Sequence, residues 1–212
     1  MSIQNRWHER YKTADIPWDT GRPDFNLIDM VTKRPIPGCR TLEVGCGTGD
    51  NAIWLARHSF RVTGSDISEI AIQKAGDKAS DAGVECRFVV ADFLRDKISG
   101  APFGLLFDRG CFHSFRSDEQ RNRFVDNAAF HLEEDGLWLS IIGSADDAPR
   151  DHGPPRHTAG EIVNAVEPHF EILSLHSSHF ESNRTTPPGA WVCLMRKRAK
   201  KRGRNNFHPR SL

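Results

Sequence analysis

Three glycines and one aspartate have the types and the spacing of a nucleoside-binding site. Gly45, Gly47 and Gly49 occupy every second position after a short apolar run, and Asp66 ends the next apolar run. Glycines in a turn between a strand and a helix let a ligand approach the bare backbone. A carboxylate at the end of the neighbouring strand can accept hydrogen bonds from both hydroxyls of a ribose. Asp66 and the adjacent Ile67 are therefore predicted nucleoside contacts.

The spacing differs from the G-x-G-x-x-G of dinucleotide-binding loops, which place a pyrophosphate on a helix N-terminus. Gly49 comes one residue early, Asp50 lies where the helix should begin, and Glu43 is nearby. These carboxylates disfavour a doubly negative group and favour a nucleoside that carries positive charge. S-adenosylmethionine (SAM), a sulfonium, has this chemistry and is the expected cofactor. The alternative is a glycine-rich turn that binds no ligand.

Two further acids end predicted strands at the same edge of the sheet. Asp92 and Phe93 follow the third apolar run, and Asp108 ends the fourth. An acid beside an aromatic ring can hydrogen-bond the exocyclic amine of adenine while the ring covers its face. For Asp92 alone, an ordinary helix-capping aspartate is the competing interpretation.

The residues after the fourth strand are the candidate catalytic groups. Arg109 is a permanent cation that can hold an anionic nucleophile, and His113 can accept a proton near neutral pH. Arg109 could instead pair with Asp108 or Asp92, and His113 could be a structural histidine at a helix start.

Aromatic residues near the N-terminus are candidate sulfonium contacts. Trp7 and Tyr11 are four residues apart and so share one face of a helix. An electron-rich ring attracts a cation by about 0.5–2 kcal/mol. Ordinary packing would use the same residues, and for Tyr11 both interpretations remain open.

The elements that position these residues alternate between strand and helix from about residue 40. This order predicts an α/β fold with a mainly parallel sheet and helices on both faces. Ligands in such folds bind beyond the carboxyl ends of the strands. Strands are expected at 40–45, 61–66, 86–91, 104–109, 137–143, 170–176 and 190–196, the last two joined as a hairpin. Helices are expected at 50–58, 68–82, 118–132 and 158–167.

The two ends of the chain differ from this core. Residues 1–37 predict two short helices, at about 4–13 and 24–32, that cap the sheet as a lid. Residues 38–198 form the core of a single domain. The basic, polar segment 199–212 is expected to be a disordered tail.

Composition limits the classes of function. The 212 residues carry a net charge of +1, which disfavours nucleic acid as the main partner, although the basic tail leaves it as an alternative. Because residues 1–6 are polar, we expect no signal peptide, and no apolar run is long enough to span a membrane. The five cysteines are scattered without C-x-x-C spacing, so we expect reduced thiols, no metal and a cytoplasmic protein. We also expect a monomer or a weak homodimer.

As an ordered set, these motifs resemble those of class I SAM-dependent methyltransferases. The resemblance covers about residues 38–143 and rests on the segment from Glu43 to Gly49, on Asp66, on Asp92 with Phe93, and on Asp108. It implies a Rossmann-like sheet of seven strands with the last strand antiparallel.

A narrower resemblance adds the flanking segments. Trp7 and Tyr11, followed by Pro-Trp-Asp-Thr-Gly-Arg-Pro at 17–23, are similar to the N-terminal lid of the thiopurine, thiol and halide methyltransferases. Residues 108–110 and 153–155 match two further segments of that family. The resemblance implies that Trp7, Tyr11 and Trp18 line the cofactor and that Arg109 faces the active site.

The expected reaction is transfer of a methyl group to a small soft nucleophile, such as a thiol, sulfide, halide or chalcogen species. A thiol is partly ionised at neutral pH, so this reaction needs little base catalysis. The alternatives are methylation of oxygen or nitrogen on a small molecule, modification of nucleic acid, and a SAM-binding protein without activity.

Overall fold

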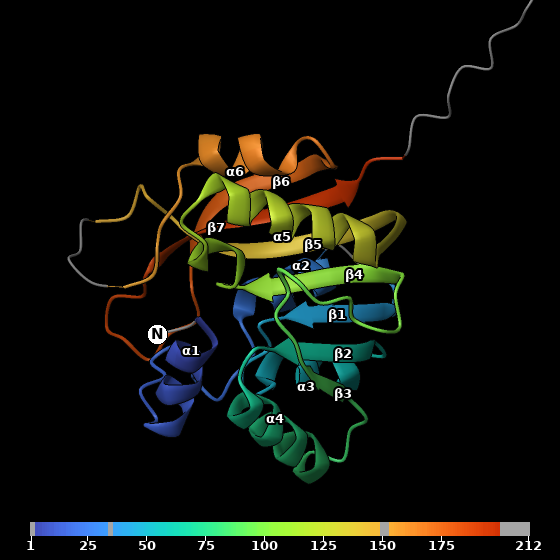
Figure 1. Ribbon diagram of the computed structural model, residues 1–212, viewed down its shortest axis with the longest axis vertical. Helices are drawn as coiled ribbons and strands as arrows, with labels where there is room; N and C mark the ends of the chain where they lie inside the picture. Colours follow the sequence, from blue (N-terminus) through green and yellow to red (C-terminus); the bar gives the residue numbers. More distant parts are fainter. Residues whose placement is uncertain (1–2, 34–35, 149–152, 200–212) are drawn as a thin grey trace, which may run out of the picture.

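A computed structural model describes residues 3–33, 36–148 and 153–199 of the chain. Its seven strands form one sheet in the order β3-β2-β1-β4-β5-β7-β6 (Figure 1). All neighbouring strands are parallel except β7, which is antiparallel to both β5 and β6. The predicted α/β fold, with its antiparallel last strand and terminal hairpin, is therefore confirmed. The strands are β1 (Arg40–Val44), β2 (Arg61–Asp66), β3 (Arg87–Val90), β4 (Phe103–Arg109), β5 (Leu132–Gly143), β6 (Phe170–His179) and β7 (Gly189–Lys197).

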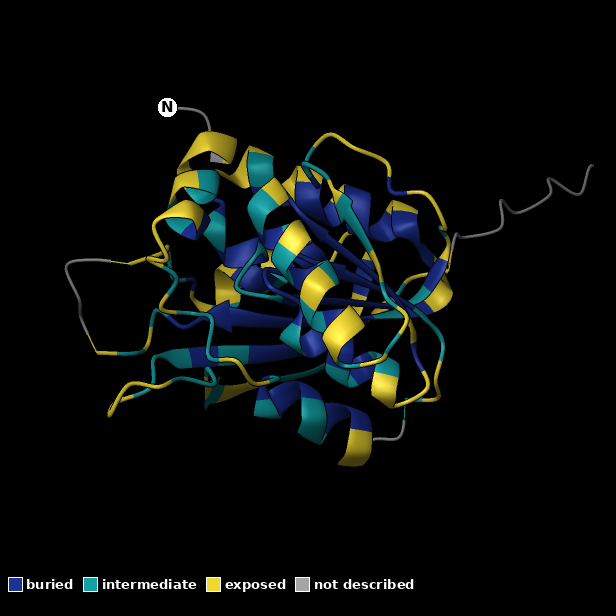
Figure 2. Ribbon diagram, turned by 90° about the horizontal axis from the view of Figure 1, so that it is seen from below, coloured by how far each residue is buried: buried dark blue, intermediate teal, exposed yellow. Residues whose placement is uncertain are grey.

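Helices cover both faces of this sheet. Apolar side chains of α5 (Asp118–His131) and α6 (Ala159–Val166) pack into one core cluster. Those of α2 (Phe25–Lys33) and α3 (Asp50–Arg57) pack into a second cluster on the opposite face. α4 (Glu69–Asp81) packs against β2 and β3, and α1 (Ile3–Lys12) packs against α4. Figure 2 shows the buried strands between these helical layers.

The parallel register brings the carboxyl ends of four strands to one edge. Val44 of β1 lies beside Ser65 of β2 and Asp108 of β4, and Asp66 lies beside Val90 of β3. The turns that follow these strands therefore meet over the middle of the sheet. The order of strands reverses between β1 and β4, which is where doubly wound sheets bind ligands.

Two local features differ from the predicted elements. Leu132 pairs with Phe103 but Leu137 pairs with Leu105, so residues 133–136 bulge out of β5. Within this bulge, Asp135 has a positive φ of 61°. The second feature is η1 (Phe112–Ser114), a 3₁₀ turn directly after β4 that the sequence pattern did not predict.

The N-terminal segment does not act as one unit. α1 contributes Trp7 and Tyr11 to the cavity described below, whereas α2 buries Leu27, Met30 and Val31 against the sheet. α2 is therefore a core helix. Residues 200–212, which hold most of the expected tail, lie outside the described residues. No helix in the described ranges is long and apolar enough to cross a bilayer.

Candidate functional site

A cavity of about 790 Å³ lies at the carboxyl edge of the sheet. Its walls come from α1, from the ends of the first four strands, from η1, and from the loops before α6 and between β6 and β7. Ten of the fourteen predicted site residues line it: Trp7, Tyr11, Trp18, Gly45, Asp66, Ile67, Asp92, Phe93, Arg109 and His113. Glu43, Gly47, Gly49 and Asp108 do not.

The three glycines of the loop have positive φ, between +55° and +88°, which favours glycine. Each also makes room for a protein neighbour. A Cβ on Gly45 would lie 2.9 Å from the Cβ of Cys111, and one on Gly47 would lie 3.0 Å from the Tyr11 hydroxyl. A Cβ on Gly49 would lie 3.0 Å from the Cβ of Ala75. The loop is thus shaped by packing as well as by any ligand.

The space above the start of α3 is small. A hollow of about 50 Å³ remains there, because residues 18–22 of the N-terminal segment lie over the glycine loop. Thr48 donates to Asp19 over 2.8 Å, and Lys78 of α4 donates to Thr48 and Asp50 over 2.7 and 2.9 Å. The Asp50 carboxylate is therefore paired. The covering segment, more than the charge of Asp50, leaves no room for a pyrophosphate.

Asp66 is held in place by the backbone of the glycine loop. Its two carboxylate oxygens accept hydrogen bonds from Gly47 N at 3.0 Å and Ser68 N at 2.9 Å. Burial raises the pKa of Asp66 to about 6, and the two N–H donors oppose that shift. An oriented carboxylate with spare lone pairs at the cavity wall has the geometry to accept ribose hydroxyls.

Glu43 lies beneath the loop and is 1 % exposed. Its Oε1 accepts a hydrogen bond from Asn51 Nδ2 at 3.1 Å, while its Oε2 has no partner among the described residues. Burial raises the pKa of Glu43 to about 8. Since Glu43 does not reach the cavity, its place favours support of the loop over direct contact with a cofactor.

The third strand ends as predicted, with both residues at the cavity. Asp92 Oδ1 accepts a hydrogen bond from Leu94 N at 3.0 Å, so the carboxylate also caps the turn. Its Oδ2 lies 3.5 Å from Nε of the exposed Arg95. Phe93 is 5 % exposed and packs edge-on against Phe124. The capping and the ligand-facing interpretations of Asp92 therefore coexist.

Asp108 acts behind the cavity. It is fully buried, and its carboxylate accepts hydrogen bonds from Phe112 N and Trp138 Nε1, both at 2.9 Å. Burial raises the pKa of Asp108 to about 6. Because the first of these bonds holds Phe112, the first residue of η1, Asp108 orients the turn that carries His113.

The three predicted lid aromatics gather on one side of the cavity. The ring of Trp18 lies edge-on to Trp7 and Tyr11, with centroid distances of 5.3 and 6.1 Å. Trp18 Nε1 also donates to the Tyr11 hydroxyl at 3.3 Å. Guanidinium groups of Arg6 and Arg10 stack on Trp7 and Trp18. These rings already bind cations of the protein itself, which indicates their affinity for positive charge.

Arg109 is engaged by the protein. Its Nε donates to Asp24 at 2.7 Å, and its other two nitrogens donate to the carbonyls of Trp18 at 3.2 Å and Glu181 at 2.6 Å. The partner is thus Asp24, and neither Asp108 nor Asp92 as the sequence had suggested. These contacts join the N-terminal segment, the end of β4 and the loop after β6.

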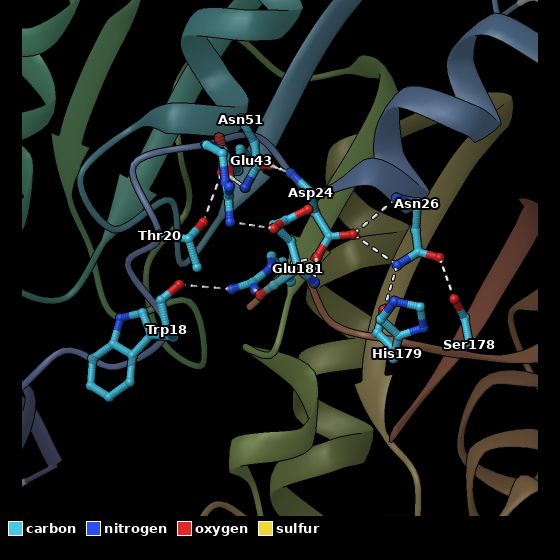
Figure 3. Close-up of polar contacts among 11 residues, drawn as sticks. Trp18, Thr20, Asp24, Asn26, Glu43, Asn51, Ser178, His179 and Glu181 are labelled. Carbon is cyan, nitrogen blue, oxygen red and sulfur yellow. Dashed lines mark hydrogen bonds and ion pairs between the residues drawn. The ribbon is translucent and has the colours of Figure 1, made fainter. Parts of the chain in front are cut away.

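Asp24 is the centre of this network (Figure 3). It is fully buried, and its Oδ2 also accepts from Glu181 N at 3.0 Å. Its Oδ1 accepts from the backbone and the side chain of Asn26, and Asp24 N donates to Asn51. Asp24 was not predicted as a site residue, because its partners Arg109 and Glu181 are far away along the chain.

His113 is 5 % exposed and lies at the cavity wall. Its Nδ1 accepts a hydrogen bond from Gly143 N at 2.7 Å. An imidazole nitrogen that accepts from an N–H carries no proton, so neutral His113 carries its proton on Nε2. The geometry therefore favours a hydrogen-bond donor over the proton acceptor that was predicted.

The chemistry of the residues that line the cavity, and the volume of the cavity, fit SAM. A carboxylate with the geometry to accept ribose hydroxyls, an acid-aromatic pair and a cluster of rings that stack on guanidinium groups line one continuous cavity. Its volume of about 790 Å³ lies in the range of small-molecule sites, roughly 300–1,000 Å³.

Comparisons with known proteins agree with this geometry. Residues 41–136 match the family model described as a methyltransferase domain. The chain is similar to thiocyanate methyltransferase 1 of Brassica oleracea, with 29 % identity over 72 % of this chain and 67 % of that protein. It is also similar to probable thiol methyltransferase 2 of Arabidopsis thaliana, with 27 % identity over 80 % and 75 %.

Solved structures share the fold at lower identity. A structure reported for the conversion of a disulfide bond into a thioacetal group during echinomycin biosynthesis has a TM-score of 0.81, 23 % identity and 93 % coverage of both chains. The SAM-bound magnesium protoporphyrin IX methyltransferase of Synechocystis PCC 6803 has a TM-score of 0.71 and 16 % identity, covering 94 % of this chain and 98 % of that one.

Proposed function

Because the chain is a class I SAM-dependent methyltransferase, we propose that it methylates a small soft nucleophile, with a thiol as the favoured acceptor. One observation carries this choice: the described residues around the acceptor end of the cavity offer no free general base. His113 has its Nδ1 engaged, and the Glu181 carboxylate pairs with Arg22 at 2.8 Å. A thiol, with a pKa near 8.5, supplies its own thiolate at neutral pH. The similarity to thiol and thiocyanate methyltransferases supports the same choice.

In this proposal the cofactor occupies the half of the cavity next to β1, β2 and β3. Asp66 accepts the ribose hydroxyls, with Ile67 beside it, and Asp92 and Phe93 hold the adenine. Trp7, Tyr11 and Trp18 surround the sulfonium. SAM supplies the electrophilic methyl group. The protein aligns the nucleophile with it and excludes water, which are the main requirements of an in-line displacement.

Arg109 acts in this proposal as a positioning residue. Its charge is balanced by Asp24, and its hydrogen bonds hold residues 18–24 and 180–181 together over the site. The guanidinium therefore links two loops. Its hydrogen bond to the Trp18 carbonyl helps to position the Trp18 side chain.

His113 acts as a hydrogen-bond donor toward the acceptor. Two substitutions separate its nitrogens, because an Asn oxygen replaces Nδ1 whereas a Gln amide replaces Nε2. We expect His113→Gln to keep the greater part of kcat and His113→Asn to lose about tenfold. In the wild type, kcat at saturating thiolate should stay flat between pH 6 and 8, because ionisation of the free thiol then changes KM and not kcat. A general base would instead give a kcat that falls below its pKa and is lost in both variants.

The test of the function is a panel of acceptors with S-adenosylhomocysteine as the measured product. We expect turnover with thiols and sulfide, and slower turnover in an Asp66→Asn variant at the same subsaturating SAM concentration, in proportion to its weaker SAM binding. Turnover of phenols or amines in the absence of thiol turnover would overturn the thiol proposal in favour of oxygen or nitrogen methylation. SAM binding without product from any acceptor would indicate a protein that binds the cofactor without activity.

A further inference from the structure

The charged residues that line the cavity are distributed unevenly. The acids Asp66 and Asp92 come from β2 and β3, in the half assigned to the cofactor. Arg116 follows η1, and Arg184 lies in the loop between β6 and β7. Since β4, β5, β7 and β6 form the other half of the sheet, these two arginines belong to the acceptor end.

The other arginines that line the cavity are engaged by the protein, and Arg6 among them stacks on Trp7. Arg109 pairs with Asp24, and Arg10 pairs with Asp15 at 3.0 Å. Arg116 and Arg184 are exposed, and neither side chain has an ion pair within the described ranges. The acid that lines the cavity near them, Glu181, is already paired with Arg22. The acceptor end therefore carries positive charge that the described protein does not neutralise.

We propose that Arg116 and Arg184 bind an anionic group on the methyl acceptor, so that the acceptor class is an organic thiol that also carries a carboxylate or a similar anion. This rests on the proposed function and names its substrate class. A guanidinium matches a carboxylate through two parallel N–H···O bonds. The nucleophilic sulfur then lies deeper in the cavity, toward His113, while the anionic group stays at the entrance.

The geometry favours an organic acceptor over a bare inorganic anion. Phe115 directly precedes Arg116, and the Phe180 ring lies 5.7 Å from the His113 ring. With Pro155 of the loop before α6, they provide apolar surface in the lining of the cavity. An atom-sized anion would leave that surface uncovered. A thiol with a short carbon chain would cover it and would reach both regions.

A second anion in the site is the carboxylate of the cofactor itself. Arg6 and Arg10 of α1 lie on the cofactor side, where that carboxylate would find a cation. The experiment must therefore measure the affinity for SAM separately from the kinetics of the acceptor.

The experiment compares two matched acceptors, 3-mercaptopropionate and 3-mercapto-1-propanol, which differ in one anionic group. The proteins are the wild type, Arg116→Gln, Arg184→Gln and the double variant. We expect the wild type to favour the anionic thiol by at least about tenfold in kcat/KM. Each single variant should lose part of this ratio and the double variant should bring it close to one, with kcat/KM for the neutral thiol changed by less than about twofold.

The control is Arg61→Gln, because Arg61 is exposed at the start of β2, at the edge of the sheet opposite the site. It should leave the ratio unchanged. Calorimetry should give the same SAM dissociation constant for all variants.

Three outcomes would overturn the proposal. The first is a wild-type ratio of kcat/KM, anionic thiol over neutral thiol, that is close to one. The second is a ratio that is as large in the double variant as in the wild type. The third is a loss of SAM affinity that accounts for the loss of rate, which would assign the arginines to the cofactor carboxylate. Equal turnover of the two thiols refutes the anion site alone, whereas no turnover of either thiol refutes the proposed function.

Discussion

Asp66 shows how one residue can be predicted from its type and position. An acid at the end of the second strand of a doubly wound sheet is the residue type expected to contact a ribose. The structure places Asp66 at the cavity wall, as this expectation requires. Asp24 could not be predicted in this way. Its partners Arg109 and Glu181 lie 85 and 157 residues away, and no local spacing encodes such a contact.

The raised pKa of Asp66 leads to a prediction for cofactor binding. With a pKa of about 6, the carboxylate is ionised above pH 6 and can accept both ribose hydroxyls. Below pH 6 a proton occupies one oxygen. We therefore expect the SAM dissociation constant, measured by calorimetry, to rise as the pH falls below 6, by up to about tenfold per pH unit.

The Asp66→Asn variant should bind SAM about 10–100-fold more weakly at pH 7.5, equivalent to about 1.4–2.8 kcal/mol. It should also lack the pH dependence. Asp77→Asn, on the exposed face of α4, is the matched control and should behave as the wild type. A pH dependence that persists in Asp66→Asn would assign the effect to another group.

Glu43 gives a prediction for stability. Its pKa of about 8 in the folded protein exceeds the usual value near 4.5, so between these limits the native state binds one proton more than the unfolded state. Stability contributed by this proton is present at low pH and is lost as the pH rises through 8. From pH 7 to 8 the free energy of unfolding should fall by up to about 1.4 kcal/mol.

Glu43→Gln should flatten this slope, because the amide does not ionise while its oxygen can still accept from Asn51. Urea unfolding at pH 7 and 8 measures the difference. The variant should be the more stable protein at pH 8. An unchanged slope in Glu43→Gln would show that Glu43 is ionised in the native state at neutral pH.

At the scale of elements, the Asp24–Arg109 pair should act as a tie between the N-terminal segment and the loop after β6. Removing one member of a buried ion pair costs about 3–5 kcal/mol, because the other charge stays buried without compensation. We expect Asp24→Asn and Arg109→Gln each to lower the unfolding free energy by this order, and the double variant to lose less than their sum. Hydrogen exchange should rise at residues 18–24 and 180–184.

Arg123→Gln is the control for this cycle. Its ion pair with Glu119 lies on the exposed face of α5 and should contribute less than about 1 kcal/mol. If Arg109→Gln abolished turnover with unchanged stability and unchanged hydrogen exchange, Arg109 would act on the acceptor and the tie would be refuted.

The pattern of elements was more predictable than their junctions. Alternating apolar runs and helical stripes are properties of short segments, so the helices and strands could be predicted to within a few residues. The bulge at 133–136 depends on the pairing of β5 with β4, and the turn η1 depends on the hydrogen bond from Phe112 N to Asp108. The packing of α2 into the core likewise depends on strands that follow it in the chain.

At the scale of the whole molecule, we propose from the described surface that the protein is a monomer. Within the described ranges, the large apolar side chains that are exposed are Val90 and Phe130, and Lys97 covers the Phe130 ring. Stable dimers bury about 1,200–2,000 Å², with an apolar centre. The edge strand β6 ends in the polar residues 176–179. Light scattering should therefore give a mass near the 23.9 kDa of one chain, and a mass of twice that value would contradict this interpretation.

The packing of the glycine loop has an evolutionary consequence. Gly45, Gly47 and Gly49 each adjoin a different part of the fold, namely Cys111, Tyr11 and Ala75, so a change at any of them requires a matching change elsewhere. The walls at the acceptor end come largely from connecting loops, which tolerate substitution and insertion far more readily than a packed core. Descendants of such a chain can therefore change their methyl acceptor through substitutions in these loops, while the sequence of the cofactor half changes slowly.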